Sequence, residues 1–452
     1  MIIERIALWC GEVGLTEAQF TERIRLAAVE GQFPANRLVP ISTNDPVAGL
    51  VRALAVRTAG SIPLLGDERW DAHVWAQLRM HAGQDTIRSD TGWAAFSSGS
   101  TGSPRLILRS EASWSSSFAA VTELMQLQST DAVYLPAPLS SSLSLFSVAH
   151  ARAVGAAIVL PISHGFDPAD LTHATVVHGT PHALRTIVES LENGQTPHRV
   201  RLAFVGGAHL DIALRRRAEA LGMRVVSYYG AAELSFVAVD TDGLGYLAFP
   251  GVEVRINPSA GDAGTGDAGR LTLGELWVRS PYLASGYHAS GSHASGSHAS
   301  GSHASGYNAS DGALRHAPGG WASVGDLVEV DSTHRLHFRG RLDGAILTGS
   351  ATVVPEDVEM ALRSIDGIED AVVLGIPNAS LGALVAVLIE TTPGGATPTA
   401  RDLRTHARSR FIPSHLPRRW YRTDHLPRTL SGKPDRDAVR RAIDNGEVTR
   451  LD

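Results

Sequence analysis

The chain has 452 residues, of which 43% are apolar, and it carries a net charge of −6 at pH 7. It has enough apolar material for a buried core and is too long for one ordinary domain, so we expect two domains. The acidic balance leaves no broad basic surface for nucleic acid or anionic lipid. It therefore favours a small-molecule substrate, with no nucleic-acid or membrane partner.

The N-terminus and the cysteine content bear on the cellular compartment. Glu4 and Arg5 interrupt the short apolar stretch at the N-terminus, and no later segment has the roughly 18 uninterrupted apolar residues of a membrane helix. We therefore expect neither export nor membrane insertion. Cys10 is the only cysteine, which excludes an internal disulfide, a cysteine-based zinc site and a cysteine redox pair. These features predict a protein of the reducing cytoplasm.

The first half of the chain alternates strands with helices. Between residues 45 and 67, apolar residues at helical spacing predict an amphipathic helix, and the run Ser61–Leu65 predicts a short strand after it. The runs VYLPAPL, AAIVLPI, RLAFVGG and MRVVSYYG predict further strands, and Pro181–Glu192 and Leu210–Leu221 predict helices among them. This alternation favours an α/β fold, in which helices cover parallel sheets.

The pattern changes after Leu271. Alternating runs such as LTLGELWVRS and LVEVDSTHRLHFRG predict the antiparallel strands of a β-rich subdomain. The C-terminal region has a separate α+β pattern, with a helix that begins at Pro355 and strands over Asp370–Ile376 and Ala383–Glu390. We therefore expect a large N-terminal domain over residues 1–341, made of helix-covered sheets and the β-rich subdomain, and a small α+β domain over residues 342–452.

An internal repeat, ASGYH-ASGSH-ASGSH-ASGSH-ASGYN, occupies Ala284–Asn308. Its period of five residues matches neither a helix nor a strand, and Ala, Ser and Gly supply little to bury, so the composition predicts a flexible surface loop. The alternative is a metal site, because histidine-rich tracts can bind metal ions. The histidines concerned are His288, His293, His298 and His303.

A small polar loop, FSSGSTGSPR, occupies residues 96–105 after an apolar run. Its glycines allow successive backbone N–H groups to point into one concavity, which suits phosphate oxygens. The spacing differs from the GxxxxGK[ST] phosphate loop, because Gly99 and Gly102 are three residues apart and no lysine follows them. An ordinary Ser/Gly-rich turn is the alternative.

The segment SSGSTGSPR resembles the phosphate loop of the adenylate-forming superfamily, which contains acyl- and aryl-CoA ligases, adenylation domains and luciferases. In that family the loop ends in Pro-Lys and closes over the phosphates of ATP. Here Arg105 replaces the lysine and keeps its charge, with a different reach, so the resemblance implies that Arg105 is catalytic. The loop residues implied to contact ATP are Ser97, Ser98, Gly99, Ser100, Thr101 and Gly102.

Two later segments resemble the adenine-binding elements of the family. The turn Gly206-Gly207-Ala208 follows the run LAFV and is similar to the turn whose backbone lies beside adenine. The segment YYGAAE is similar to the YGxTE element, which implies that Tyr229 stacks on adenine, that Gly230 is part of the ATP site and that Glu233 holds Mg²⁺ on the phosphates. A lone glutamate beside ATP suits Mg²⁺, which prefers oxygen ligands and few protein carboxylates.

Three further elements resemble family motifs toward the C-terminus. GWASVGD is similar to GWxxTGD, which implies that Asp326 binds the ribose hydroxyls. GRLD is similar to GRxD, which implies a nucleotide contact for Arg341 and a hinge between the domains at Asp343. LPRTLSGKPDR is similar to PxTxSGKxxR, which delivers the adenylation lysine from the small domain. That residue is Lys433, the only lysine among 40 basic residues.

These elements occur in the order of the family and imply its activity. The family activates a carboxylic acid with ATP as acyl-AMP, releases pyrophosphate, and passes the acyl group to a thiol after its small, mobile domain rotates about the hinge. Coenzyme A is the simplest acceptor, because no carrier domain is recognisable after the last motif, and a separate carrier protein is the alternative. The sequence departs from the motifs at Arg105, Ala232 and Leu347. These departures motivate the alternative that the protein binds nucleotide without turnover.

The acid is indicated by the stretch Leu135–Leu143, which the resemblance implies to be part of the substrate pocket together with Tyr228. Adenylation domains for α-amino acids place an aspartate there, and this stretch contains no acidic residue. Because a buried ammonium without a partner is costly, we expect an aryl or short acyl acid without an α-amine. Many CoA ligases have a histidine after the proline where Ser140 or Ser141 follows Leu139 here, and YYGAAELSFVA resembles the succinylbenzoate-CoA ligase branch.

Overall fold

The computed structural model describes residues 4–451 except for residues 68–69, 71, 73–74, 77–78, 80–81, 83–86, 98–104, 163–165, 195–197, 259–271, 289–313, 342–343, 345, 349–350, 379–381, 393–397, 412–414 and 430–431. The described residues group into two compact units. The first contains residues up to 253 together with 278–288, and the second contains those within 254–277 and 314–451. No helix among the described residues is both long and apolar enough to cross a membrane.

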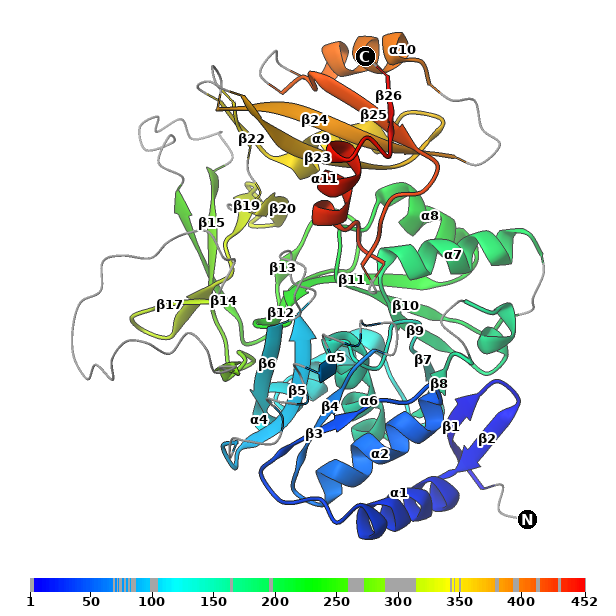
Figure 1. Ribbon diagram of the computed structural model, residues 1–452. Coiled ribbons are helices and arrows are strands. Elements are labelled where there is room, and N and C mark those ends of the chain that lie inside the picture. The colour runs from blue at the N-terminus through cyan, green and yellow to red at the C-terminus, as the bar shows by residue number, and fades with distance from the viewer. Residues whose placement is uncertain are drawn as a thin grey trace. The chain divides into compact units, whose positions relative to one another are not determined.

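A nine-stranded sheet forms the centre of the first unit (Figure 1). Its inner strands are parallel to one another, and antiparallel strands flank them at both edges. In sheet order the strands are β13 (Leu247–Ala248), β12 (Ser235–Asp240), β11 (Arg224–Ala231), β10 (Leu202–Val205), β9 (Val176–Gly179), β7 (Ala132–Tyr134), β8 (Ala157–Leu160), β1 (Ile6–Cys10) and β2 (Val13–Thr16).

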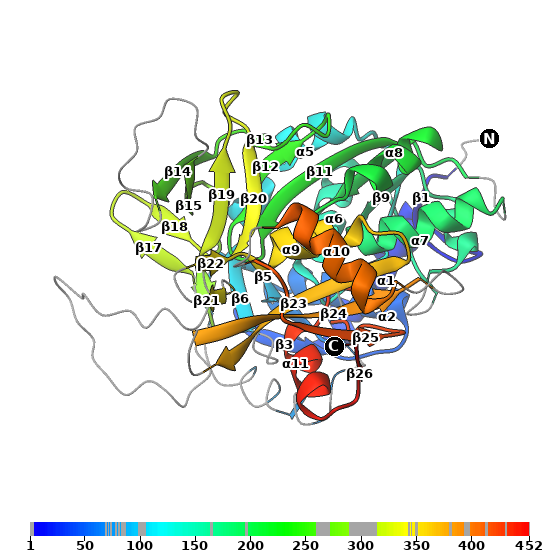
Figure 2. The ribbon, with the colours of Figure 1, turned by 90° about the horizontal axis from the view of Figure 1, so that it is seen from above.

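Helices connect the parallel strands and cover the sheet, and α7 and α8 lie side by side (Figures 1 and 2). Ser141, Thr180 and Asp211 start three of them, since each side chain accepts a hydrogen bond from a backbone N–H of the first turn. The helices are α4 (Glu111–Ser115), α5 (Phe118–Met125), α6 (Ser142–Val154), α7 (Pro181–Glu192) and α8 (Ile212–Ala220), with a 3₁₀ turn, η1, at Pro168–Thr172.

The N-terminal part of this unit adds helices α1 (Glu17–Gly31) and α2 (Pro46–Thr58), which pack against each other. The parallel strands β3 (Leu38–Ile41) and β4 (Ile62–Leu65) flank α2 in the chain. Asp45 caps α2 by accepting from two backbone N–H groups, and a proline occupies the first helical position, where no N–H donor is needed. The helix and strand expected between residues 45 and 67 are therefore confirmed.

A small three-stranded sheet contains the start of the repeat. Strand β6 (Arg105–Ser110) pairs with β5 (Thr91–Ser97) on one side and with β16 (Gly286–Tyr287) on the other. The backbone N–H groups of Ser285 and His288 also donate to carbonyls of β6, at 2.9 Å each. The prediction of a loop is therefore wrong for the first repeat unit, because its backbone completes a sheet. The remaining units, with His293, His298 and His303, lie outside the described residues.

An antiparallel sheet begins the second unit, in agreement with the alternating pattern after Leu271. Strand β15 has β14, β18 and β19 as neighbours, and β19 pairs with β20. The strands are β14 (Glu253–Pro258), β15 (Thr272–Arg279), β17 (Arg315–Ala317), β18 (Trp321–Ser323), β19 (Asp326–Val330) and β20 (Leu336–Arg341).

A second sheet in this unit is sandwiched between helices. Helices α9 and α10 share one apolar core with one face of the sheet, around Trp420, and α11 packs against the other face through Val439 (Figure 2). The strands are β21 (Ile346–Thr348), β22 (Ala351–Val353), β23 (Ile368–Asn378), β24 (Gly382–Thr391), β25 (Arg419–Thr423) and β26 (Thr449–Arg450), and the helices are α9 (Pro355–Arg363), α10 (Ala400–Arg410) and α11 (Arg436–Asp444).

The structure confirms the expected α/β fold, with helix-covered parallel strands, a β-rich region and an α+β C-terminal region. The helix expected from Pro355 and both strands expected after it are present as α9, β23 and β24. The domain boundary between residues 341 and 342 stays a prediction.

Candidate active site

Residues expected to bind adenine lie at the carboxyl end of the central parallel strands. Gly206 follows β10, and its backbone N–H donates to the carbonyl of Gly179, at the end of β9. A Cβ on Gly206 would come within 2.1 Å of the ring of Tyr228 on β11. Only glycine fits this close approach, and the next residue, Gly207, has a positive φ of 87° that also favours glycine. Carboxyl ends of parallel strands are where α/β proteins bind ligands.

A chain of buried polar groups lies behind Tyr228. The hydroxyl of Tyr228 and Nε2 of His178 are 2.9 Å apart, and Nδ1 of the same histidine is 2.5 Å from the hydroxyl of Ser147 on α6. The Ser147 hydroxyl donates to the carbonyl of Leu143, at 2.9 Å. Because that bond uses the only hydroxyl proton, Ser147 accepts from Nδ1–H, and Nε2 of His178 accepts the proton of Tyr228.

Burial sets the ionisation of this chain of groups. His178 is 1% exposed, and burial lowers its pKa from 6.5 to about 3, with a smaller contribution from nearby His150. Burial also raises the pKa of Tyr228 above its ordinary value. Both side chains are therefore neutral at physiological pH, and Tyr228 is fixed by a neutral hydrogen bond in an aromatic cluster with Phe204 and Phe236, whose ring centroids are each 4.7 Å from its own.

The expected pocket residues Leu139, Ser140 and Ser141 lie just before α6. Ser141 is the N-cap of that helix, and its side chain accepts from the backbone N–H of Ser144. Ser140 is 8% exposed, and Leu139 and Ser141 are half-buried. Ser147 of α6 contacts His178, and His178 contacts Tyr228. Helix α6 therefore links the two serines before it to Tyr228, the other residue expected to line the substrate pocket.

The segment that carries Glu233 turns sharply after β11. A bulge between Tyr229 and Gly230 shifts the register with β12, and a Cβ on Gly230 would come within 2.2 Å of the carbonyl oxygen of Ser235. Ser235 has a φ of 60°, in the left-handed region. This bulged turn places the half-buried Glu233 between β11 and β12.

Two hydrogen bonds from the segment around β16 hold Glu233. The hydroxyl of Tyr287 on β16 donates to its Oε1 at 2.8 Å, and the backbone N–H of Ala284 donates to its carbonyl at 2.8 Å. No described residue hydrogen-bonds to its other oxygen, Oε2. A carboxylate with one oxygen that no described residue hydrogen-bonds fits Mg²⁺, which keeps several waters and takes its other ligands from phosphates. Among the described residues no group of three or more acidic, His or Cys side chains could hold a metal ion.

Arg109 anchors the residue before Glu233. Its Nε and one terminal nitrogen donate to the carbonyl of Ala232, at 3.1 and 3.0 Å, and the other terminal nitrogen donates to the carbonyl of Tyr282 and to the hydroxyl of Ser113. The side chain is fully buried, and burial lowers the pKa of Arg109 to about 9. The negative charge of Glu233 acts in the other direction and raises this pKa. The guanidinium therefore joins β6, the Glu233 turn and the segment before β16.

The central residues of the expected phosphate loop, Ser98, Gly99, Ser100, Thr101 and Gly102, lie outside the described residues. The two ends of the loop are described. Ser97 is the last residue of β5, Arg105 is the first residue of β6, and the two are paired across the antiparallel ladder. The contacts proposed for this loop stay predictions.

In the second unit, Asp326 and Arg341 occupy paired positions at the ends of β19 and β20. The turn before Asp326 is fixed by the buried Ser323, whose hydroxyl accepts from the backbone N–H of Gly325 at 3.0 Å and donates to Glu275. Gly325 has a φ of 86°, which a side chain would disfavour. The structure thus brings together two of the expected nucleotide residues, while the hinge residue Asp343 lies outside the described residues.

Lys433 lies in a tight turn of the second unit, just before α11. Its carbonyl accepts from the backbone N–H of Thr429 at 2.7 Å, and Gly432, beside it, has a φ of 80°. Arg428 at one end of the turn forms an ion pair with the buried Glu390 at 2.5 Å. Arg436 at the other end forms one with the buried Glu359 at 2.7 Å. Ion pairs at both ends therefore hold the turn that carries the lysine.

Four contacting residues were not expected from the sequence. The family elements did not include Arg109, Ser147, His178 and Tyr287. Tyr287 stands where the middle repeat units have serine, and this departure from the repeat was a visible signal, whereas Arg109 only follows the apolar run LIL. Ser147 and His178 offered no such signal, because polar residues within apolar runs are common.

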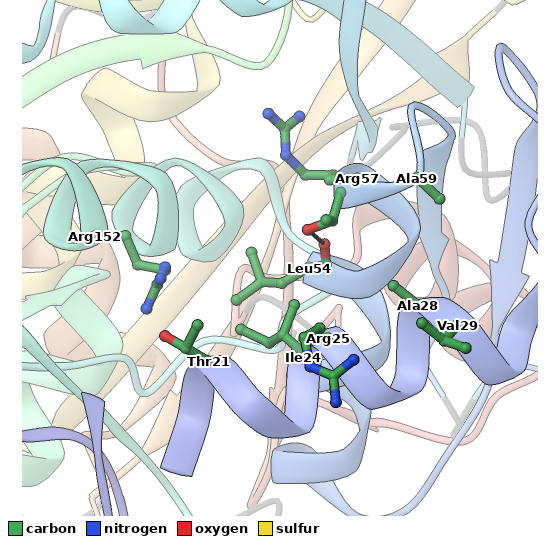
Figure 3. Close-up of a pocket in the computed structure, with 10 residues that line it drawn as sticks. Thr21, Ile24, Arg25, Ala28, Val29, Leu54, Arg57, Ala59 and Arg152 are labelled. Carbon is green, nitrogen blue, oxygen red and sulfur yellow. Dashed lines mark hydrogen bonds between the residues drawn. The ribbon is translucent and has the colours of Figure 1, made fainter. Parts of the chain in front are cut away.

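A groove lies between α1 and α2 (Figure 3). It has a volume of about 720 Å³ and an apolar floor that includes Ile24 and Leu54, with Arg57 and Arg152 at its sides. Both arginines already pair with acids, Glu111 and Glu17 respectively. None of the residues singled out in the sequence lines this groove.

Known proteins resemble the chain over nearly its whole length. A curated relative, "Putative long chain fatty acid-CoA ligase VraA" of Staphylococcus epidermidis, is 23% identical over 485 aligned positions, which cover 98% of this chain and 96% of that protein. The o-succinylbenzoate CoA synthetase MenE of Bacillus subtilis, solved with the acyl-adenylate OSB-AMP, superposes with a TM-score of 0.78 at 18% identity, covering 97% of this chain and 96% of that one.

The amide bond synthetase McbA of Marinactinospora thermotolerans superposes with a TM-score of 0.79 at 22% identity, covering 97% of each chain. At such identities the solved structures establish the shared fold. A family model for the AMP-binding enzyme C-terminal domain matches residues 357–433. The model for the AMP-binding enzyme matches residues 31–288, more than half of the chain. The chain therefore belongs to the AMP-binding enzyme family, the adenylate-forming superfamily that its motifs resemble.

Proposed function

We propose that the protein is an acid–thiol ligase that activates a carboxylic acid with ATP and transfers the acyl group to coenzyme A. In the first step a carboxylate oxygen attacks the α-phosphorus of ATP, the bond to the bridging oxygen breaks, and pyrophosphate leaves. In the second step the sulfur of coenzyme A attacks the acyl carbon, the bond to AMP breaks, and the thiol proton passes to solvent.

The observation that carries this proposal is the geometry of Glu233. Tyr287 orients its carboxylate by a hydrogen bond to Oε1, and Glu233 lies in the turn that follows β11, the strand that carries Tyr228 and Tyr229. Glu233 would hold Mg²⁺ there, and the ion would supply positive charge against the phosphates. MenE of Bacillus subtilis was also solved with ATP and a magnesium ion, which supports the choice of ligands.

The remaining roles follow from charge. A carboxylate that approaches a triphosphate meets another anion, so cations must neutralise both the attacking oxygens and the departing pyrophosphate. We assign this task to Lys433 and Arg105, and assign the ribose and nucleotide contacts to Asp326 and Arg341. A lysine suits a mobile role, because its compact ammonium on a flexible stem can contact carboxylate and phosphate oxygens together.

We propose a compact aryl or short acyl acid without an α-amine as the substrate. The stretch Leu135–Leu143 contains no carboxylate that could pair with an ammonium. Phe204 and His178 fill the space behind Tyr228 and are at most 1% exposed. The pocket therefore has no room for a long acyl chain behind Tyr228. The name of the VraA relative points instead to long-chain fatty acids, and an acid panel decides between the two.

The test is ATP–pyrophosphate exchange by the purified protein across aryl, short acyl, long-chain and α-amino acids. Exchange driven best by a compact acid supports the proposal, whereas an α-amino acid or a long-chain acid that exceeds every compact acid overturns the substrate class. Absence of exchange with every acid, together with retained ATP binding, would support a nucleotide-binding protein without turnover. Titration of the acyl-AMP complex with coenzyme A then distinguishes this acceptor from a carrier protein.

A further inference from the structure

We propose that Arg109 and Tyr287 are positioning residues that hold Glu233 in the orientation in which its carboxylate meets the magnesium ion of ATP. This inference rests on the proposed role of Glu233. It concerns two side chains whose functions the family motifs do not explain.

The first argument is the position of the Arg109 charge. The side chain is fully buried, and no carboxylate of the described residues forms an ion pair with it. Burying an unpaired cation costs several kcal/mol, so its retention calls for a compensating set of hydrogen bonds. All of its donated bonds go to the hydroxyl of Ser113 and to two backbone carbonyls, and the doubly bonded carbonyl belongs to Ala232, next to Glu233.

The second argument is the bond from Tyr287. Its hydroxyl donates to Oε1 of Glu233 at 2.8 Å, which orients the carboxylate, and no described residue hydrogen-bonds to Oε2. The backbone of the same segment holds the other side of Glu233, because Ala284 N–H donates to its carbonyl. A charged acceptor makes this hydrogen bond stronger than one between neutral groups.

The third argument is that Arg109 and Tyr287 belong to the same small sheet. Arg109 lies on β6, and Tyr287 lies on β16, which pairs with β6 through Ile107. Strand β6 begins at the end of the expected phosphate loop. One small sheet therefore fixes both the loop end and Glu233, two groups that must keep a constant separation if they bind the same triphosphate.

The test uses Mn²⁺ as a probe for the metal, and electron paramagnetic resonance measures free Mn²⁺ in the presence of ATP and the full-length protein. Tyr287→Phe removes only the hydroxyl and should raise the dissociation constant of Mn²⁺·ATP by about threefold to tenfold, as expected for one hydrogen bond to a charged group. Tyr134→Phe is the matched control, because that hydroxyl also donates to a carboxylate, Asp170 at 3.0 Å, away from Glu233. It should leave the constant unchanged.

A double-mutant cycle separates the possible outcomes. If Tyr287 acts through Glu233, Tyr287→Phe should add little to the loss caused by Glu233→Gln. Additive losses, or an unchanged constant in Tyr287→Phe alone, overturn the inference. If Glu233→Gln itself leaves Mn²⁺·ATP binding unchanged, the metal role in the proposed function fails instead. Arg109→Lys keeps the charge but not the paired donors to Ala232, and it should weaken Mn²⁺·ATP binding while circular dichroism reports whether the fold persists.

Discussion

The hydroxyl of Tyr228 donates a hydrogen bond to Nε2 of His178, 2.9 Å away, and is fixed there by the histidine tautomer that Ser147 imposes. Removing the hydroxyl of Tyr228 tests whether this residue is part of the acid-binding pocket. Tyr228→Phe leaves a buried nitrogen without its donor, which costs about 1–3 kcal/mol. We expect lower stability to urea and a KM for the acid that rises more than the KM for ATP.

The control for this prediction removes both polar partners. Tyr228→Phe combined with His178→Leu leaves no orphaned nitrogen at that position and should recover part of the lost stability, although Ser147 then loses its donor. Equal increases in both KM values would show that Tyr228 does not distinguish the acid from the nucleotide.

We expect two buried histidines, His178 and His150, to lower the stability of the protein in acid. Burial lowers the pKa of His178 to about 3 and that of His150 to about 4, below the ordinary value of 6.5. The unfolded chain therefore binds protons that the folded chain does not, and the stability from these groups is complete above about pH 6.5 and falls as the pH drops toward 3. Urea midpoints across this range should decline with pH, and His178→Gln should make the decline shallower.

The single lysine allows a chemical test of the adenylation step. Lys433→Ala should lose acyl-AMP formation by several orders of magnitude, because an interaction made in the transition state is removed. Thioester formation from supplied acyl-AMP should be largely spared. Lys433→Arg should also stay poorly active, since a planar guanidinium does not reproduce the compact ammonium contact. Full adenylation by the alanine variant would remove the role assigned to this residue.

Lys433 also permits stoichiometric labelling. Acylation of side-chain amines can modify only this residue, apart from the α-amine of the chain. We expect one equivalent of label to inactivate adenylation and ATP with the cognate acid to protect against it. Retained activity in the fully labelled protein would contradict the assignment.

The second to fourth repeat units should be dispensable. Removing residues 289–303 keeps β16 and Tyr287, and a shorter connection closes at slightly lower entropic cost. Melting temperature and pyrophosphate exchange should both stay close to those of the full chain. Loss of folding in this variant, or a metal requirement that disappears with it, would instead indicate a role for the histidines.

The sequence predicted the elements of the fold and the contiguous motifs, because each depends on residues that are close in the chain. The helix from Pro181 and the strand that contains Tyr228 are examples. It did not predict the pairs that fix the site, such as Tyr287 with Glu233, 54 residues apart, and Arg109 with Ala232, 123 residues apart. Such pairs depend on strand order and register, and the sequence of one chain read by itself does not reveal either.

The place of Tyr287 in a tandem repeat has a consequence for the gene. Slippage during DNA replication adds or removes whole pentapeptide units without changing the reading frame, and the second to fourth units are identical. Because we expect those three copies to form a flexible connection, their loss or gain should change only its length. Loss of the first unit instead moves ASGSH next to β6 and puts a serine opposite Glu233. Natural variants of this gene should therefore differ in the number of internal copies and should keep a tyrosine in the first.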